Sequence, residues 1–186
     1  MYAVSEQYKN TIKSYNRTSA IYGTRTTGKG TVYSLTDSNI IKDSLYITNQ
    51  IVNNSKLCFG SVYAGECGLV INSDIDRYSL FGAEIKLNII INDESIPLGV
   101  FYVDTSERIG SKIKLTAIDK MSNFDVALEE NTNGSWFELL NLISTRCNVE
   151  LAQTQEELVQ MHQNVAVQSY TFSKDRIDTY RDALSY

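Results

Sequence analysis

Between residues 84 and 118 the chain alternates between apolar and polar residues, and this alternation constrains the fold more than any other feature. Residues 84–91 and 112–118 each place their apolar members on one face, as half-buried strands do: Ile85, Leu87 and Ile89 in the first, and Ile113, Leu115 and Ala117 in the second. A third strand is expected at 98–103. Polar turns at 92–95 and near Gly110 can join these strands directly, which predicts an antiparallel barrel or sandwich.

The preceding residues predict one helix followed by short strands. Apolar and aromatic residues recur at helical spacing in the first segment, at Val4, Tyr8, Ile12 and Tyr15. Residues rich in Ile, Val, Thr and Tyr predict strands at 18–22, 31–35, 39–48 and 61–71. Clusters of Gly, Asn, Ser and Asp predict turns at 27–30, 53–55 and 72–74.

Helical periodicity returns near residue 130. Two capping boxes, Ser135 with Glu138 and Thr154 with Glu157, predict helices that end near Asn148 and Gln163. A brief strand is expected near Tyr170. A third apolar stripe then begins at Ile177, Tyr180 and Leu184.

These patterns predict a mainly β fold with short helices (α+β). Residues 1–130 are expected to form an antiparallel β-barrel-like domain that carries the N-terminal helix. Residues 131–186 are expected to be the start of a smaller α/β segment, a second α+β domain. Its last helix is barely begun at Tyr186, so we expect this domain to be truncated.

Composition excludes several classes of protein. Apolar residues make up 42% and charged residues 21%, which is ordinary for a soluble globular protein. The net charge of −5, without a Lys/Arg cluster, argues against a nucleic-acid binding site. No apolar run is long enough for a membrane segment, and the first residues lack the pattern of a signal peptide. Twelve tyrosines and a single proline favour strands and extensive contact surfaces.

The run Gly23–Gly30 nearly matches the sequence motif of a phosphate-binding P-loop. That loop needs a Ser or Thr after its Lys to hold magnesium, and a following helix whose N-terminus faces the phosphates. Here Gly30 follows Lys29, and residues 31–35 read as a strand. A hairpin loop is therefore the favoured interpretation.

The three cysteines, Cys58, Cys67 and Cys147, cannot all pair with one another and show no metal-ligand spacing, so we expect reduced thiols. A Cys147–His162 couple could act as a thiol hydrolase, but the favoured interpretation of His162 is a solvent-facing side chain. The glycines that flank Cys67, Gly65 and Gly68, favour a bulge or bend in a strand.

Two pairs of acidic residues, Asp74 with Asp76 and Glu129 with Glu130, could be read as glycosidase carboxylates, although solvated charge is the default in loops. Trp136 could stack on a sugar, but its spacing from Leu139, Leu140 and Ile143 favours a core position. We therefore assign no catalytic, cofactor-binding or metal-ligating residue, and we expect that the chain is not an enzyme.

The stretch Ile96–Asp104 carries the pattern PLGxFxV, and after a glycine turn Ile113–Met121 carries IxLTAxDKM. Together they resemble the N-terminal region of phage tail-tip hub proteins, the siphophage tail-associated proteins related to the baseplate hub of contractile-tailed phages. Residues 8–17, 136–151 and 180–184 are also similar to the family, but only the residues from Ile96 to Met121 are specific.

The resemblance implies a hub domain that packs with copies of itself into a ring, typically a homotrimer with quasi-sixfold symmetry. Such a ring adapts the sixfold tail tube to the threefold tip. The implied partners are the chain itself and the distal tail, tail-tube and tape-measure proteins. The implied location is the virion tail tip of a phage or prophage, after synthesis in the bacterial cytoplasm. Any cell-wall hydrolase activity would belong to a C-terminal region absent from this sequence.

Two other classes of function stay open at this point. A carbohydrate-binding β-module would use exposed Tyr and Asp side chains to bind host surface glycans. A hydrolase would use Cys67 or Cys147 as its nucleophile.

Overall fold

The structure, a computed structural model, describes residues 3–15, 18–49, 63–161 and 168–185. These residues divide into two compact units, the first made of 3–49 and 64–119, and the second made of Tyr63 and the described residues from Lys120 onward. The division lies somewhat before the expected boundary between residues 130 and 131. Antiparallel strands dominate the elements and the helices are short, which confirms the expected mainly β (α+β) class.

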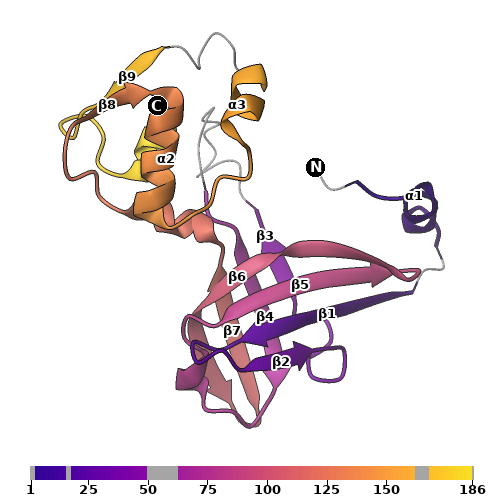
Figure 1. Cartoon of the computed structure of the whole chain (residues 1–186). Helices are drawn as coiled ribbons and strands as arrows, with labels where there is room; N and C mark the ends of the chain where they lie inside the picture. Colours follow the sequence, from indigo (N-terminus) through magenta and orange to yellow (C-terminus); the bar gives the residue numbers. More distant parts are fainter. Residues whose placement is uncertain (1–2, 16–17, 50–62, 162–167, 186) are drawn as a thin grey trace. The chain divides into compact units, whose positions relative to one another are not determined.

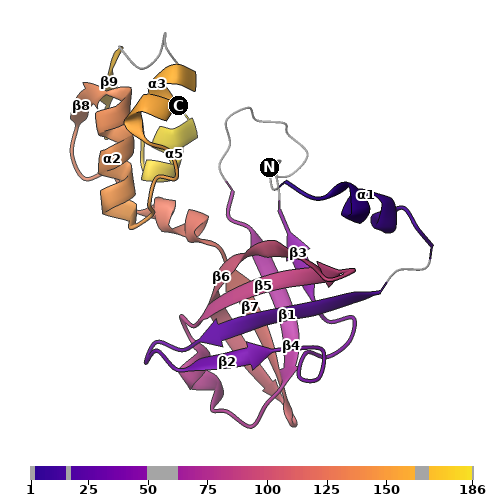
Figure 2. The same cartoon turned by 45° about the vertical axis from the view of Figure 1, so that its right-hand side comes forward.

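The first unit is built on one antiparallel sheet with the strand order β2-β1-β5-β6-β7-β4-β3 (Figure 1). Its strands are β1 (Ser19–Thr26), β2 (Val32–Leu35), β3 (Tyr46–Thr48), β4 (Glu66–Asn72), β5 (Glu84–Ile91), β6 (Glu94–Ile109) and β7 (Lys112–Ile118). The sheet curls so that β1, β2 and β5 lie across β4 and β7 (Figures 1 and 2). Among the described residues β2 and β3 form the two edges of the sheet and do not pair with each other, so the barrel-like sheet is open.

The alternation read from the sequence becomes the core of this unit. Strands β5 and β7 have the predicted bounds, and Ile85, Ile113 and Leu115 are fully buried between the curled halves of the sheet. Side chains from β2, β4, β5, β6 and β7 form one apolar cluster. The polar members of each strand, such as Lys112 and Lys114, lie on the other face, which explains why these strands alternate.

Strand β6 is much longer than the predicted segment 98–103. The turn before it has only two residues, Asn92 and Asp93, with φ of 48° and 65°, a conformation that suits a tight hairpin. A bulge opposite Leu87 and Asn88 falls at Pro97–Gly99, where Gly99 has φ 148°. Pro97 is tolerated because this half of β6 pairs only with β5; the pairing with β7 begins at Tyr102.

The strand predicted at 39–48 is wrong for most of its length. Only an isolated bridge between Ile40 and Ile71 and the short strand β3 are extended there. Asn39 explains the difference, since its Nδ2 donates to the Ser34 carbonyl at 2.8 Å and its Oδ1 accepts from the Thr36 amide at 2.9 Å. These local bonds turn the chain where its β-branched composition had favoured a strand.

The pairing of β3 with β4 places the ring of Tyr46 against Gly68. A Cβ on Gly68 would lie 2.1 Å from Cε1 of Tyr46, so the tyrosine ring occupies the space that a side chain at residue 68 would need. The Tyr46 hydroxyl also donates to Glu66 at 2.5 Å. The predicted bulge around Cys67 is wrong, because β4 pairs with β7 in unbroken register and the glycine instead accommodates the ring.

The N-terminal helix α1 (Glu6–Ile12) is attached to the turn between β5 and β6. Ser5 caps it by accepting from the Tyr8 amide, and the Ser5 hydroxyl and amide both donate to Glu94. On the same side Asn92 donates to the Thr11 hydroxyl at 2.8 Å. None of the residues of α1 is buried, so these hydrogen bonds attach the helix to the sheet.

The second unit combines helices with a two-stranded sheet. Its elements are the 3-10 helix η2 (Lys120–Asp125), β8 (Thr132–Ser135), α2 (Trp136–Cys147), α3 (Gln155–Met161), β9 (Ser169–Phe172) and α5 (Tyr180–Ser185). Both predicted capping boxes are confirmed, and Asn148 ends α2 with φ 53°. A third box, Thr179 with Asp182, begins α5. The core joins η2, α2, β9 and α5 through Phe124, Leu139, Ile143, Phe172 and Tyr180.

Candidate functional site

The P-loop-like run forms a hairpin, as expected. Residues 27–31 connect β1 to β2, with the Thr27 amide donating to the Thr31 carbonyl at 3.0 Å and the Gly30 amide to the Thr27 carbonyl at 2.8 Å. A strand follows the loop, so the helix N-terminus that a P-loop directs at phosphate is not formed here.

Burial favours the protonated form of both described thiols. Cys67 lies in the sheet core with no exposed surface, and burial, with a smaller contribution from Glu66, raises its pKa to about 12. Burial also raises the pKa of Cys147 at the end of α2. A nucleophilic thiol needs a lowered pKa, so these environments oppose the hydrolase hypothesis. His162, the expected partner of Cys147 in that hypothesis, lies outside the described residues, as does Cys58.

One member of each pair of carboxylates has a local structural contact. Asp76 caps the 3-10 helix η1 (Arg77–Leu80) by accepting from the Tyr78 amide at 3.1 Å. Glu130 contacts the exposed Arg146 at 3.6 Å. Trp136 is the first residue of α2 and is half-buried outside the apolar core of its unit, so its predicted core position is wrong.

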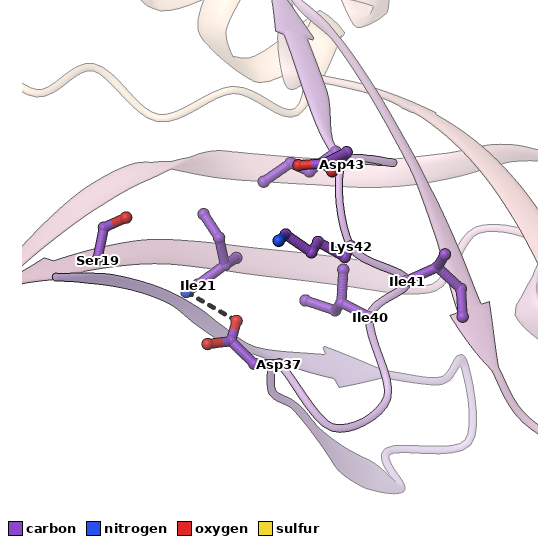
Figure 3. Close-up of a pocket in the computed structure, with 8 residues that line it drawn as sticks. Ser19, Ile21, Asp37, Ile40, Ile41, Lys42 and Asp43 are labelled. Carbon is purple, nitrogen blue, oxygen red and sulfur yellow. Dashed lines mark hydrogen bonds between the residues drawn. The ribbon is translucent and has the colours of Figure 1, made fainter.

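A depression of about 450 Å³ lies in the first unit beside the segment that follows β2 (Figure 3). Ile21, Ile40 and Leu45 line it together with Asp37 and Lys42. Asp37 Oδ1 accepts from the Ile21 amide at 3.1 Å, so this carboxylate ties the segment to β1. Among the described residues, no group of three or more His, Cys, Asp or Glu side chains lies close enough to hold a metal ion.

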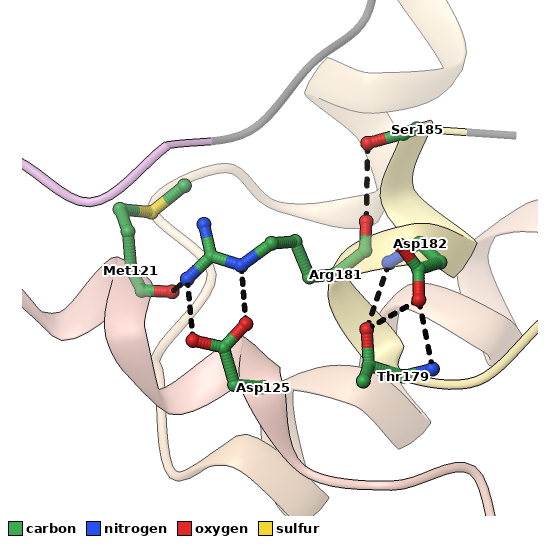
Figure 4. Close-up of polar contacts among 6 residues, drawn as sticks. All are labelled: Met121, Asp125, Thr179, Arg181, Asp182 and Ser185. Atoms are coloured by element: carbon green, nitrogen blue, oxygen red, sulfur yellow. Dashed lines mark hydrogen bonds and ion pairs between the residues drawn. The ribbon is translucent and has the colours of Figure 1, made fainter. Parts of the chain in front are cut away.

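In the second unit a group of polar contacts centres on Arg181 (Figure 4). Its guanidinium donates to both carboxylate oxygens of Asp125 and, at 2.7 Å, to the Met121 carbonyl. The arginine thereby joins α5 to η2. These bonds have a structural role, because Asp125 and Met121 both belong to η2 of the same unit.

One end of the first unit gathers exposed apolar side chains. Thr26 pairs with both Val32 and Glu84, so the β1–β2 hairpin and the start of β5 meet there. Figures 1 and 2 both show this hairpin beside η1. We call the surface the hairpin end; its members are Val32 (60% exposed), Tyr33 (39%), Tyr78 (72%) and Phe81 (72%).

Two arginines reinforce the aromatic character of the hairpin end. Arg25 lies 4.5 Å from the centroid of the Tyr33 ring, and Arg77 lies 4.6 Å from that of Tyr78. Exposed Tyr and Phe beside Arg are the composition of protein–protein interfaces. The hairpin end is therefore the candidate functional site of this chain, and it is suited to contact another protein.

The sequence did not point to this surface. The strand expected at 18–22 stops before Arg25, whereas β1 continues to Thr26. Extending the predicted strand by four residues would have placed Arg25 on its inward face. A charged residue on an inward face is the sequence signal for this site.

No helix in the described ranges is both long and apolar enough to cross a membrane. No protein-family model and no curated protein matches the chain. Among solved structures it is similar to a chain described as "Virion of native gene transfer agent (GTA) particle", with a TM-score of 0.43 and 10% identity. The match covers 61% of this chain and 44% of that one, so this chain spans less than half of that protein's length.

Proposed function

We propose that this chain is a virion structural protein of a phage or prophage tail tip, a baseplate hub subunit. It self-associates into a ring that adapts the tail tube to the tip, and it contacts the distal tail, tail-tube and tape-measure proteins. In this role the chain has no catalytic task.

The observation that carries the proposal is the residue pattern from Ile96 to Met121, which resembles the hub family. In the structure the PLGxFxV part forms the bulged half of β6, and the LTAxDKM part runs from β7 into η2. These strands lie in the middle of the sheet order. The family pattern thus covers central strands of the first unit and continues into the first residues of the second unit.

The surface of the first unit is compatible with this role. A ring requires an adhesive patch on each subunit, and closed symmetry keeps such patches from producing open-ended assemblies. The hairpin end supplies exposed aromatic side chains of the kind that dominate binding energy at interfaces.

The assembly state of the protein tests the proposal. Light scattering coupled to size-exclusion chromatography, with negative-stain microscopy, is expected to show rings. Changing Tyr78 and Phe81 together to Ser is expected to weaken ring formation, whereas Tyr15→Ser, which removes a fully exposed tyrosine elsewhere, leaves it unchanged. A strictly monomeric protein that binds host glycans would overturn the proposal in favour of a carbohydrate-binding module.

A further inference from the structure

Arg25 is a buried charge with an unused donor. The residue is 3% exposed, and its Nε has no hydrogen-bond partner. Among the described residues it forms no ion pair, and its one specific contact is with the ring of Tyr33. Burial lowers the pKa of its guanidinium, which is the expected response to desolvation without a counter-ion.

The strand register places this charge on the core side of the sheet. Arg25 pairs directly with Ile85, which is fully buried, and the next inward position of β1, Gly23, pairs with Leu87. A guanidinium in such surroundings is costly unless an anion and hydrogen bonds accompany it. The contact with one tyrosine ring offsets only part of that cost.

The missing anion does not come from the first unit. All 22 Asp and Glu residues of the chain lie in the described ranges, and none in the first unit forms an ion pair with Arg25. The guanidinium is covered by the Tyr33 ring, which is itself 39% exposed, so a single side chain separates it from the surface. A carboxylate from outside this unit would meet it at the hairpin end.

A second copy of this chain has the required chemistry. Its net charge is −5, so it offers many carboxylates, and it carries the same exposed aromatic patch to add apolar contact. We infer that a second copy docks on the hairpin end and places one of its carboxylates against the guanidinium of Arg25. The inference rests on the proposed self-association and adds the surface and the residue that recognise the neighbour.

Arg25→Met tests this assignment, because the two explanations of the arginine predict opposite effects. If the charge awaits a carboxylate from another copy, methionine removes an unsatisfied buried group. The isolated subunit then unfolds at an equal or higher urea concentration, while the dissociation constant for self-association rises roughly a hundredfold. If the arginine only supports its own unit through Tyr33, methionine lowers the urea midpoint and leaves self-association unchanged.

Sedimentation velocity over a range of concentrations measures the association, and urea unfolding of the dilute protein measures the subunit. Arg146→Met removes an equal charge from an exposed site and is expected to change neither. Should the methionine variant not fold, Arg25→Lys keeps the charge without the planar fork and is expected to weaken association about tenfold.

The failures of the two proposals can be told apart. A wild-type chain that associates as tightly as Arg25→Met refutes the docking assignment and leaves the hub proposal standing. A wild-type protein that stays monomeric at every concentration refutes both.

Discussion

Gly23 in β1 provides the sharpest test of how the sheet is packed. A Cβ at this position would lie 2.1 Å from the Lys86 carbonyl oxygen and 3.1 Å from Cδ2 of Leu87. An ordinary carbon–oxygen contact is about 3.3 Å, so β1 and β5 would have to separate by roughly 1 Å. Because the nearest atom belongs to the backbone, no side-chain rotation relieves the clash. Gly23→Ala is therefore expected to cost about 3 kcal/mol, at the upper end for overpacking.

Thermal unfolding followed by circular dichroism is the assay, and this cost corresponds to a fall in the melting temperature of about 10 °C. Gly28→Ala is the matched control from the same hairpin, since a Cβ there meets nothing within 4 Å. That variant should equal the wild type or be slightly more stable, because alanine restricts the unfolded chain. A Gly23→Ala protein within about 0.5 kcal/mol of the wild type would refute the packing of β1 against β5.

Three further changes test the thiol and the helix ends. Because the pKa of Cys67 is raised to about 12 in the folded protein, the thiol contributes its full stabilisation below about pH 9 and progressively less toward pH 12. The free energy of unfolding, measured in urea, should therefore fall less steeply over this range in Cys67→Ala than in the wild type. Ser135→Ala breaks the capping box of α2 and should cost about 1 kcal/mol, read from the fluorescence of the single tryptophan beside it. Asn148 has a left-handed φ of 53°, so Asn148→Gly should be neutral, while Asn148→Val should cost about 1–2 kcal/mol in the same assay.

The parts of the fold that the sequence predicted well are those in which local pattern and tertiary environment agree. Strands β5 and β7 alternate because one face packs in the core, and both capping boxes satisfy the helix ends with neighbouring residues. The capping box of α5 follows the same rule with Asp182 in place of Glu, and allowing for aspartate would have found it.

The errors arise where side chains override local preference. Ile40 and Ile41 favour a strand, but hydrogen bonds of Asn39 turn the chain beside them. The candidate site was missed for a different reason. Tyr78 and Phe81 lie far from Tyr33 in sequence, and only the pairing of Thr26 with both Val32 and Glu84 brings their segments to one end of the sheet.

The contact between Tyr46 and Gly68 has a consequence for how this sequence can diverge. The Tyr46 ring fills the volume that a side chain at residue 68 would need, so substitutions at the two positions depend on each other. Enlarging residue 68 alone would force the ring out of its place on the sheet. Among descendants of this chain, a larger residue at position 68 is therefore expected to occur together with a smaller one at position 46, and this pairwise dependence would mark the β3–β4 contact in an alignment.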